Sequence, residues 1–252
     1  MNKEYITLLY RVGVLLLFLL SLSLNALAQK EYSVCFYDSA RSRVIPITVY
    51  SPAKENKNTQ VVIFNHGYDS NQNPKSNQTY TYLTNFLAEK GFYVISIQHE
   101  QSNDPPLAMD GDLAVTRMPN WERGEANILF TLETFKALKP MLNWSKLILI
   151  GHSNGGDMAM LCATDYPQLF SKVISLDHRR MPMPRTSSSR LYSIRGCDYE
   201  ADAGVLPNKK EEKKYQITVV RLNKITHSDM GQRGTKEQHN TINQCLYEFI
   251  KK

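Results

Sequence analysis

Short, continuous apolar runs alternate along the chain with longer stretches that have the spacing of amphipathic helices. The apolar runs are typical of strands that are buried on both faces of a sheet. They predict strands at residues 33–37, 44–50, 60–65, 92–97, 147–150, 172–176, 191–194 and 217–222. The helical spacing predicts helices at residues 80–90, 123–138, 156–165 and 237–250. This order predicts an α/β fold with a mostly parallel central sheet and helices on both faces.

The pentapeptide at residues 151–155 carries the clearest chemical signal. It reads Gly-His-Ser-Asn-Gly, follows the apolar run at 147–150 and opens into a predicted helix. A small residue two positions either side of Ser153 allows the backbone to turn sharply, which leaves the hydroxyl exposed at the N-terminus of the helix. The pattern predicts that Ser153 is a nucleophile.

A serine hydroxyl becomes a good nucleophile only beside a base, which a carboxylate must orient. In proteins with this type of serine turn, the acid and then the histidine follow the serine along the chain. His227 lies just after the last predicted strand, where a loop can bring an imidazole to Ser153. We therefore expect His227, rather than His178 or His239, to be the base.

Three aspartates are candidates for the acid. Asp202 and Asp198 both follow the strand predicted at 191–194, and Asp177 ends the strand before it. We favour Asp202, because an acid followed by a small-apolar turn and a proline is the commoner arrangement. Asp198 and Asp177 remain alternatives.

An oxyanion formed on the substrate would need two hydrogen-bond donors. The backbone N–H that follows the nucleophile belongs to Asn154. The second donor is expected from the loop after the strand at 60–65, where His66-Gly67 allows the chain to turn and Tyr68 offers its N–H.

These residues resemble the α/β-hydrolase superfamily. The sequence from residue 45 to the closing helix is similar to the group of dienelactone hydrolases, platelet-activating-factor acetylhydrolases and polyester hydrolases. The loop at 66–68 resembles the oxyanion turn of the polyester hydrolases, and residues 151–155 resemble their nucleophile elbow. The acetylhydrolases place their acid at the strand that here ends in Asp177. The resemblance implies ester hydrolysis through an acyl-enzyme, without a metal or a cofactor.

The connection at residues 98–122 is long and polar. Connections of this length without evident secondary structure are usually functional or disordered. We expect it to line the substrate cleft, with Trp121 and Met118 as apolar walls. Asp110 and Asp112 are too few carboxylates for a metal site.

The first 28 residues have the pattern of an export signal. Lys3 and Arg11 give a positive start, residues 12–24 are almost wholly apolar, and Ala26 to Ala28 form a small-x-small cleavage site. We expect a signal peptide at 1–28, cleavage near Ala28, and an exported hydrolase domain at 29–252, either periplasmic or secreted. The apolar run is short for a membrane span, so none is expected after cleavage.

The net charge of +6 is modest and accompanies no nucleic-acid motif, so no nucleic-acid partner is expected. In an exported chain the four cysteines permit a disulfide, and we favour Cys197 with Cys245. The sequence leaves the oligomeric state open.

The favoured function is a serine hydrolase that cleaves a small-molecule or lipid-like carboxylic ester. The same triad could instead cleave amides or peptides, or transfer an acyl group. A non-catalytic binding protein with this fold is the third alternative, which an intact serine, histidine and aspartate set argues against.

Overall fold

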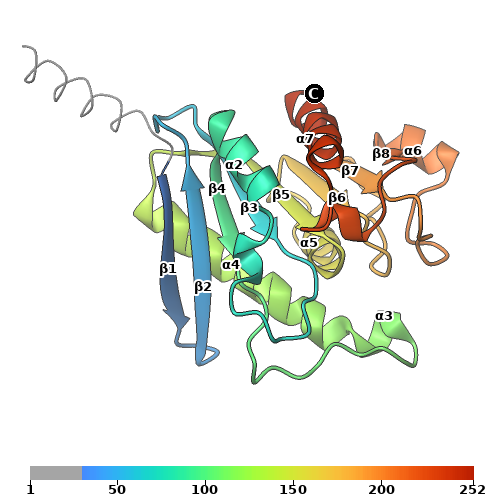
Figure 1. Ribbon diagram of the computed structural model, residues 1–252, viewed down its shortest axis with the longest axis horizontal. Helices are drawn as coiled ribbons and strands as arrows, with labels where there is room; N and C mark the ends of the chain where they lie inside the picture. The colour runs from blue at the N-terminus through green and yellow to red at the C-terminus, as the bar shows by residue number, and fades with distance from the viewer. Residues whose placement is uncertain (1–29) are drawn as a thin grey trace, which may run out of the picture.

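The computed structural model describes residues 30–252, so the predicted signal peptide lies outside the described residues. Within this range one sheet organises the molecule (Figure 1). Its strands are β1 (Lys30–Asp38), β2 (Arg43–Ser51), β3 (Gln60–Asn65), β4 (Tyr93–Ile97), β5 (Asn143–His152), β6 (Lys172–Leu176), β7 (Arg190–Arg195) and β8 (Thr218–Arg221).

The strand order is β1-β2-β4-β3-β5-β6-β7-β8. In this order, the six neighbouring strands β4, β3, β5, β6, β7 and β8 pair in parallel. Strand β2 is antiparallel to both β1 and β4. Because β3 lies between β4 and β5, the chain reverses its direction of travel across the sheet there. Ligand sites of open parallel sheets lie outside the carboxyl ends of strands at such a reversal.

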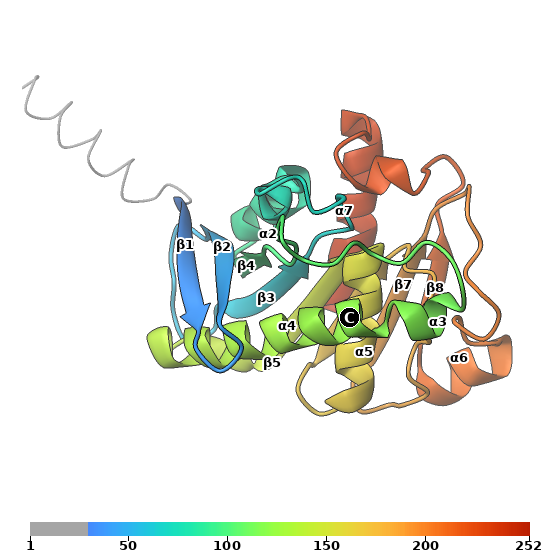
Figure 2. The same ribbon diagram turned by 90° about the horizontal axis from the view of Figure 1, so that it is seen from below.

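Helices cover both faces of the sheet, as Figures 1 and 2 show. The longer ones are α2 (Thr81–Glu89), α4 (Met118–Leu138), α5 (Asn154–Asp165) and α7 (Lys236–Lys251). The shorter ones are η1 (Ser76–Gln78), α3 (Leu113–Thr116), α6 (Lys209–Tyr215) and η2 (Ser228–Met230). Side chains of α4 and α5 join one apolar cluster, and side chains of α2 and α7 join the other.

Strand β3 illustrates why the apolar runs are continuous. Val61 and Ile63 point into the cluster that holds α4 and α5, whereas Val62 and Phe64 point into the cluster that holds α2 and α7. Successive side chains of a strand face opposite sides of the sheet, so a strand covered on both sides needs apolar residues at every position. The predicted fold class is confirmed.

Three details differ from the sequence-based expectations. Helix α4 begins at Met118 rather than at residue 123, with a proline in its first turn. Helix α6 falls in a segment for which no helix was expected, although Asn208 and Glu211 form a reciprocal capping box there. All four cysteines are free, so the favoured pair Cys197 and Cys245 is not a disulfide.

In the described part of the chain, no helix combines the length and the apolar character that a bilayer crossing requires.

Candidate active site

Ser153 occupies a strained turn between β5 and α5. Its backbone has φ 52° and ψ −121°, in the positive-φ region that non-glycine residues rarely adopt. A Cβ atom on Gly151 would lie 2.1 Å from the carbonyl oxygen of Gly155. A Cβ atom on Gly155 would lie 2.4 Å from the carbonyl oxygens of Asn65 and His66. The turn is therefore tight enough to require both glycines of the predicted pentapeptide.

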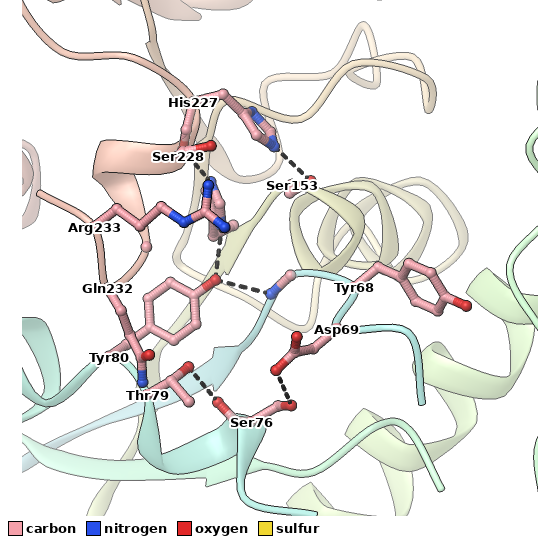
Figure 3. A pocket seen from close by; sticks show the side chains of 13 residues that line it. Tyr68, Asp69, Ser76, Thr79, Tyr80, Ser153, His227, Ser228, Gln232 and Arg233 are labelled. Carbon is pink, nitrogen blue, oxygen red and sulfur yellow. Dashed lines mark hydrogen bonds between the residues drawn. The ribbon is translucent and has the colours of Figure 1, made fainter. Parts of the chain in front are cut away.

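The structure brings Ser153 and His227 together. Oγ of Ser153 lies 2.9 Å from Nε2 of His227, a hydrogen bond drawn in Figure 3. His227 comes from the loop between β8 and η2, as expected from its place after the last strand. The second nitrogen of its ring, Nδ1, lies 2.6 Å from Oδ2 of Asp177.

Asp177 follows β6 directly and is fully buried. Its Oδ1 accepts a hydrogen bond from the backbone N–H of Gly196 at 2.9 Å and lies 3.0 Å from Nη2 of Arg195. Burial alone would raise the pKa of Asp177, but the hydrogen bond with His227 and the charge of Arg195 outweigh it and lower the pKa. Asp177 is therefore a carboxylate at neutral pH.

An ionised Asp177 fixes the tautomer of His227. A carboxylate can only accept, so Nδ1 of His227 carries the proton and Nε2 presents its lone pair. The hydroxyl of Ser153 then donates to Nε2, which is the direction in which a general base would take the proton.

Asp202, the acid favoured from the sequence, lies elsewhere. It pairs with Nη1 of Arg180, and its side chain is 47% exposed. Asp198, the second candidate, accepts a hydrogen bond from the backbone N–H of His227 at 2.7 Å and so holds the loop rather than the imidazole. Only Asp177, the third candidate, reaches the ring.

Both residues predicted to provide oxyanion donors flank Ser153. Asn154 is the first residue of α5, so its backbone N–H has no helical partner four residues earlier. A Cβ atom on Gly67 would lie 3.3 Å from Cβ of Ser153, which puts the Gly67–Tyr68 peptide beside the serine. The Tyr68 ring points away from His227 in Figure 3, and its hydroxyl accepts a hydrogen bond from the N–H of Leu107.

The predicted apolar walls are not part of the cleft. Trp121 is fully buried in the core, and its Nε1 donates to Oδ1 of Asn154 at 2.9 Å. Met118 packs against the same core. Both lie on α4, which begins earlier than the sequence suggested, and a helix packed on the sheet turns its apolar side chains inward.

A cavity of about 310 Å³ opens beside Ser153 and His227. Its walls come from residues within 67–80, 152–153 and 227–233, and no residue of the long connection at 98–122 lines it. The lining residues are Gly67, Tyr68, Asp69, Ser76, Thr79, Tyr80, His152, Ser153, His227, Ser228, Gly231, Gln232 and Arg233. The lining offers hydroxyl, carboxylate, amide and guanidinium groups, and it includes no leucine, isoleucine, valine or methionine.

Sequence reasoning missed several residues that support the site. Arg195 pairs with Asp177, and Glu100 accepts hydrogen bonds from the backbone N–H groups of Asp69 and Asn71, just after the loop at residues 66–68. Burial raises the pKa of Glu100 to about 7. The sequence offered a signal for His152, because it lies inside the pentapeptide at residues 151–155.

The sheet order and the serine turn after β5 define an α/β-hydrolase fold, which confirms the resemblance seen in the sequence. The chain belongs to the chlorophyllase family, whose model matches residues 25–179. The sequence matches no curated protein. The matched segment contains Ser153 and Asp177 but ends before His227.

Solved structures support the fold. A dienelactone hydrolase from Anabaena variabilis is 19% identical with a TM-score of 0.59, covering 88% of this chain and 96% of that one. The esterase Est22 is 11% identical with a TM-score of 0.64, covering 90% and 82%. An acylaminoacyl peptidase from Pyrococcus horikoshii is 14% identical with a TM-score of 0.63, covering 89% of this chain but 42% of that one.

Proposed function

We propose that this protein is a serine hydrolase that cleaves carboxylic esters through an acyl-enzyme. The observation that carries the proposal is the hydrogen-bonded series from Ser153 through His227 to Asp177. A serine with no catalytic role needs neither a strained backbone nor a histidine oriented by a buried carboxylate.

The geometry supports the following reaction. Ser153 attacks the ester carbonyl while Nε2 of His227 takes its proton, and Asp177 stabilises the imidazolium that forms. The backbone N–H groups of Tyr68 and Asn154 donate to the oxyanion. His227 then gives the proton to the departing alcohol. A water molecule, activated by the same histidine, releases the acid and restores the serine.

The polar lining of the cavity favours esters with short or polar substituents. The name of the family refers to chlorophyll. A long hydrocarbon chain gains binding free energy only from apolar contacts, at roughly 25 cal/mol per Å². The cavity beside Ser153 offers few of these, so we propose a small ester as the substrate.

Labelling with a fluorophosphonate probe tests the proposal, together with turnover of p-nitrophenyl acetate. The wild-type protein should be labelled and active, and Ser153→Ala should lose both properties. Ser145→Ala is the matched control, because Ser145 is an exposed serine near the start of β5. Labelling that persists in Ser153→Ala would show that another nucleophile reacts. Rates on an ester and an amide with the same acyl group would separate ester hydrolysis from amide cleavage.

Export is part of the proposal, and it rests on the composition of residues 1–28. Cell fractionation followed by N-terminal sequencing of the mature protein tests it. The expected N-terminus is Gln29. A cytoplasmic protein that keeps its first 28 residues would refute export without affecting the proposed chemistry.

A further inference from the structure

A second histidine lies beside the proposed catalytic residues and has no role in the mechanism above. His152 precedes Ser153 and is buried. Its Nδ1 lies 2.7 Å from Oη of Tyr80, and its Nε2 lies 3.1 Å from the backbone carbonyl oxygen of His227. Oη of Tyr80 in turn accepts a hydrogen bond from the backbone N–H of Gly67 at 3.1 Å. In Figure 3 the Tyr80 side chain is labelled, and dashed lines at its hydroxyl mark the hydrogen bonds that it makes.

The direction of each hydrogen bond is fixed by chemistry. Burial lowers the pKa of His152 to about 3, so the ring is neutral and carries one proton. The carbonyl of His227 can only accept, which places that proton on Nε2. Nδ1 then accepts from the hydroxyl of Tyr80, whose pKa burial raises, so that it keeps its proton. The result is an ordered series from the Gly67 N–H to the His227 carbonyl.

This series joins the three segments that must be in register for the reaction. Gly67 belongs to the loop that offers the Tyr68 oxyanion donor, His152 belongs to the serine turn, and His227 is the base. The packing leaves little room between them. A Cβ atom on Gly67 would lie 3.0 Å from Nδ1 of His152 and 3.2 Å from Oη of Tyr80.

We propose that Tyr80 and His152 are positioning residues that hold the oxyanion loop and the loop of His227 in register with Ser153. The inference rests on the proposed function, because it concerns the same reaction. Neither side chain needs to exchange a proton. A displacement of about 1 Å in a catalytic group can cost roughly a hundredfold in rate. Hydrogen bonds that hold the two loops in place can therefore affect kcat.

Four variants test the proposal through kcat and KM on p-nitrophenyl acetate and through the thermal midpoint. Tyr80→Phe removes one oxygen and adds no atom. His152→Phe keeps a ring but loses both hydrogen bonds, whereas the amide of His152→Gln offers an acceptor and a donor in similar relative positions. Tyr93→Phe is the matched control, because its buried hydroxyl contacts Tyr32 at the amino end of β4, away from the site.

We expect Tyr80→Phe and His152→Phe to lower kcat by about tenfold each, with KM within about twofold of the wild type. A tenfold change in rate corresponds to about 1.4 kcal/mol, which is within the range of one hydrogen bond. His152→Gln should recover a large part of the loss. Tyr93→Phe should keep its kcat, even where its thermal midpoint falls as far as that of Tyr80→Phe. A purely structural role would not separate these variants in this way.

Several results would overturn the proposal: an unchanged kcat in both phenylalanine variants, a loss confined to KM, or a His152→Gln variant no better than His152→Phe. If His152→Phe fails to fold, Tyr80→Phe carries the test. A Ser153→Ala variant that keeps its turnover would refute the proposed role of Ser153 as nucleophile, and with it the proposed function. Loss of turnover in Ser153→Ala with normal kcat in the Tyr80 and His152 variants would refute the positioning role alone.

Discussion

Asp177 and Arg195 form an ion pair beneath the imidazole of His227, with 3.0 Å between Oδ1 and Nη2 and both side chains almost completely buried. The second oxygen of the same carboxylate contacts His227. One carboxylate therefore neutralises a buried guanidinium and orients the proposed base. Activity and stability should consequently depend on the same residue.

Asp177→Asn should lower kcat by about 10³–10⁴-fold, because an amide no longer selects the required tautomer of His227. The same change leaves the charge of Arg195 without a counterion, which should cost about 3–5 kcal/mol of stability. Rates on p-nitrophenyl acetate, measured well below the lowered thermal midpoint, separate the two effects.

Asp202→Asn is the control for this prediction. Asp202 contacts Arg180 on an exposed surface, where an ion pair contributes at most about 1 kcal/mol. We expect its kcat to stay within about twofold of the wild type. The assignment of the acid would be wrong if Asp202→Asn were inactive and Asp177→Asn were not.

The fold could be predicted from the sequence because a doubly covered sheet has a strong local signature. Each core strand is a continuous apolar run, and the turn at Ser153 needs glycines at fixed positions. The acid could not be chosen in the same way. Asp177, Asp198 and Asp202 all follow strands at the carboxyl edge of the sheet. Which of them reaches His227 depends on loop conformation, and Asp177 adopts φ 54°.

Trp121 shows a second limit of the sequence. A large aromatic residue at the end of a polar connection is compatible with a cleft wall or with the first turns of a core helix. The start of α4 decides between them, and helix boundaries are set by tertiary contacts as well as by local preference. In this case Trp121 supports Asn154 from behind the site.

Trp121→Phe should therefore reduce stability rather than change substrate preference. It leaves Oδ1 of Asn154 without its donor and removes part of a buried ring, which should cost about 1–3 kcal/mol. KM for p-nitrophenyl esters of different chain lengths should stay within about twofold of the wild type. Thermal unfolding and steady-state kinetics check both parts. A variant whose KM differs from the wild-type KM by an amount that depends on chain length would indicate that Trp121 lines the cleft.

Four buried histidines should make the protein sensitive to acid. Burial lowers the pKa of His66 to about 4, lowers that of His99 well below its ordinary 6.5, and lowers those of His152 and His178 to about 3. The unfolded chain binds these protons more readily than the folded protein. As pH falls below about 6.5, the free energy of unfolding should decrease by up to about 1.4 kcal/mol per pH unit for each histidine.

Buried carboxyl groups oppose this loss near neutrality. The pKa of Glu100 is raised to about 7 and that of Asp157 to about 6, both chiefly by burial, so their protonation favours the folded protein as pH falls. This stabilising contribution is complete once the pH has fallen to about 4, near the pKa values of these carboxyl groups in the unfolded chain. The free energy of unfolding should therefore fall most steeply below pH 5. Thermal midpoints measured from pH 7 to pH 4 test this. The midpoint of His178→Gln should fall less steeply with pH than that of the wild type. Equal slopes in the two proteins would contradict the contribution of His178 to acid sensitivity.

The lining of the cavity leads to a prediction about chain length. Thr79, Gln232 and Arg233 line the space beside Ser153, so each added methylene of an acyl chain would displace water from polar groups without gaining apolar contacts. We expect kcat/KM to be highest for p-nitrophenyl acetate or butyrate and to fall towards the palmitate.

Gln232→Leu examines whether the polar lining causes this preference. Gln232 is exposed on the rim, so a leucine there would add apolar surface without disturbing the core. The variant should improve kcat/KM for the longer esters by a few-fold, since one or two methylenes in contact are worth about 0.8 kcal/mol each. Gln168→Leu, an exposed glutamine that does not line the cavity, should leave the series unchanged. A wild-type preference for palmitate would instead mean that long chains bind outside the cavity, along a surface that Gln232 does not influence.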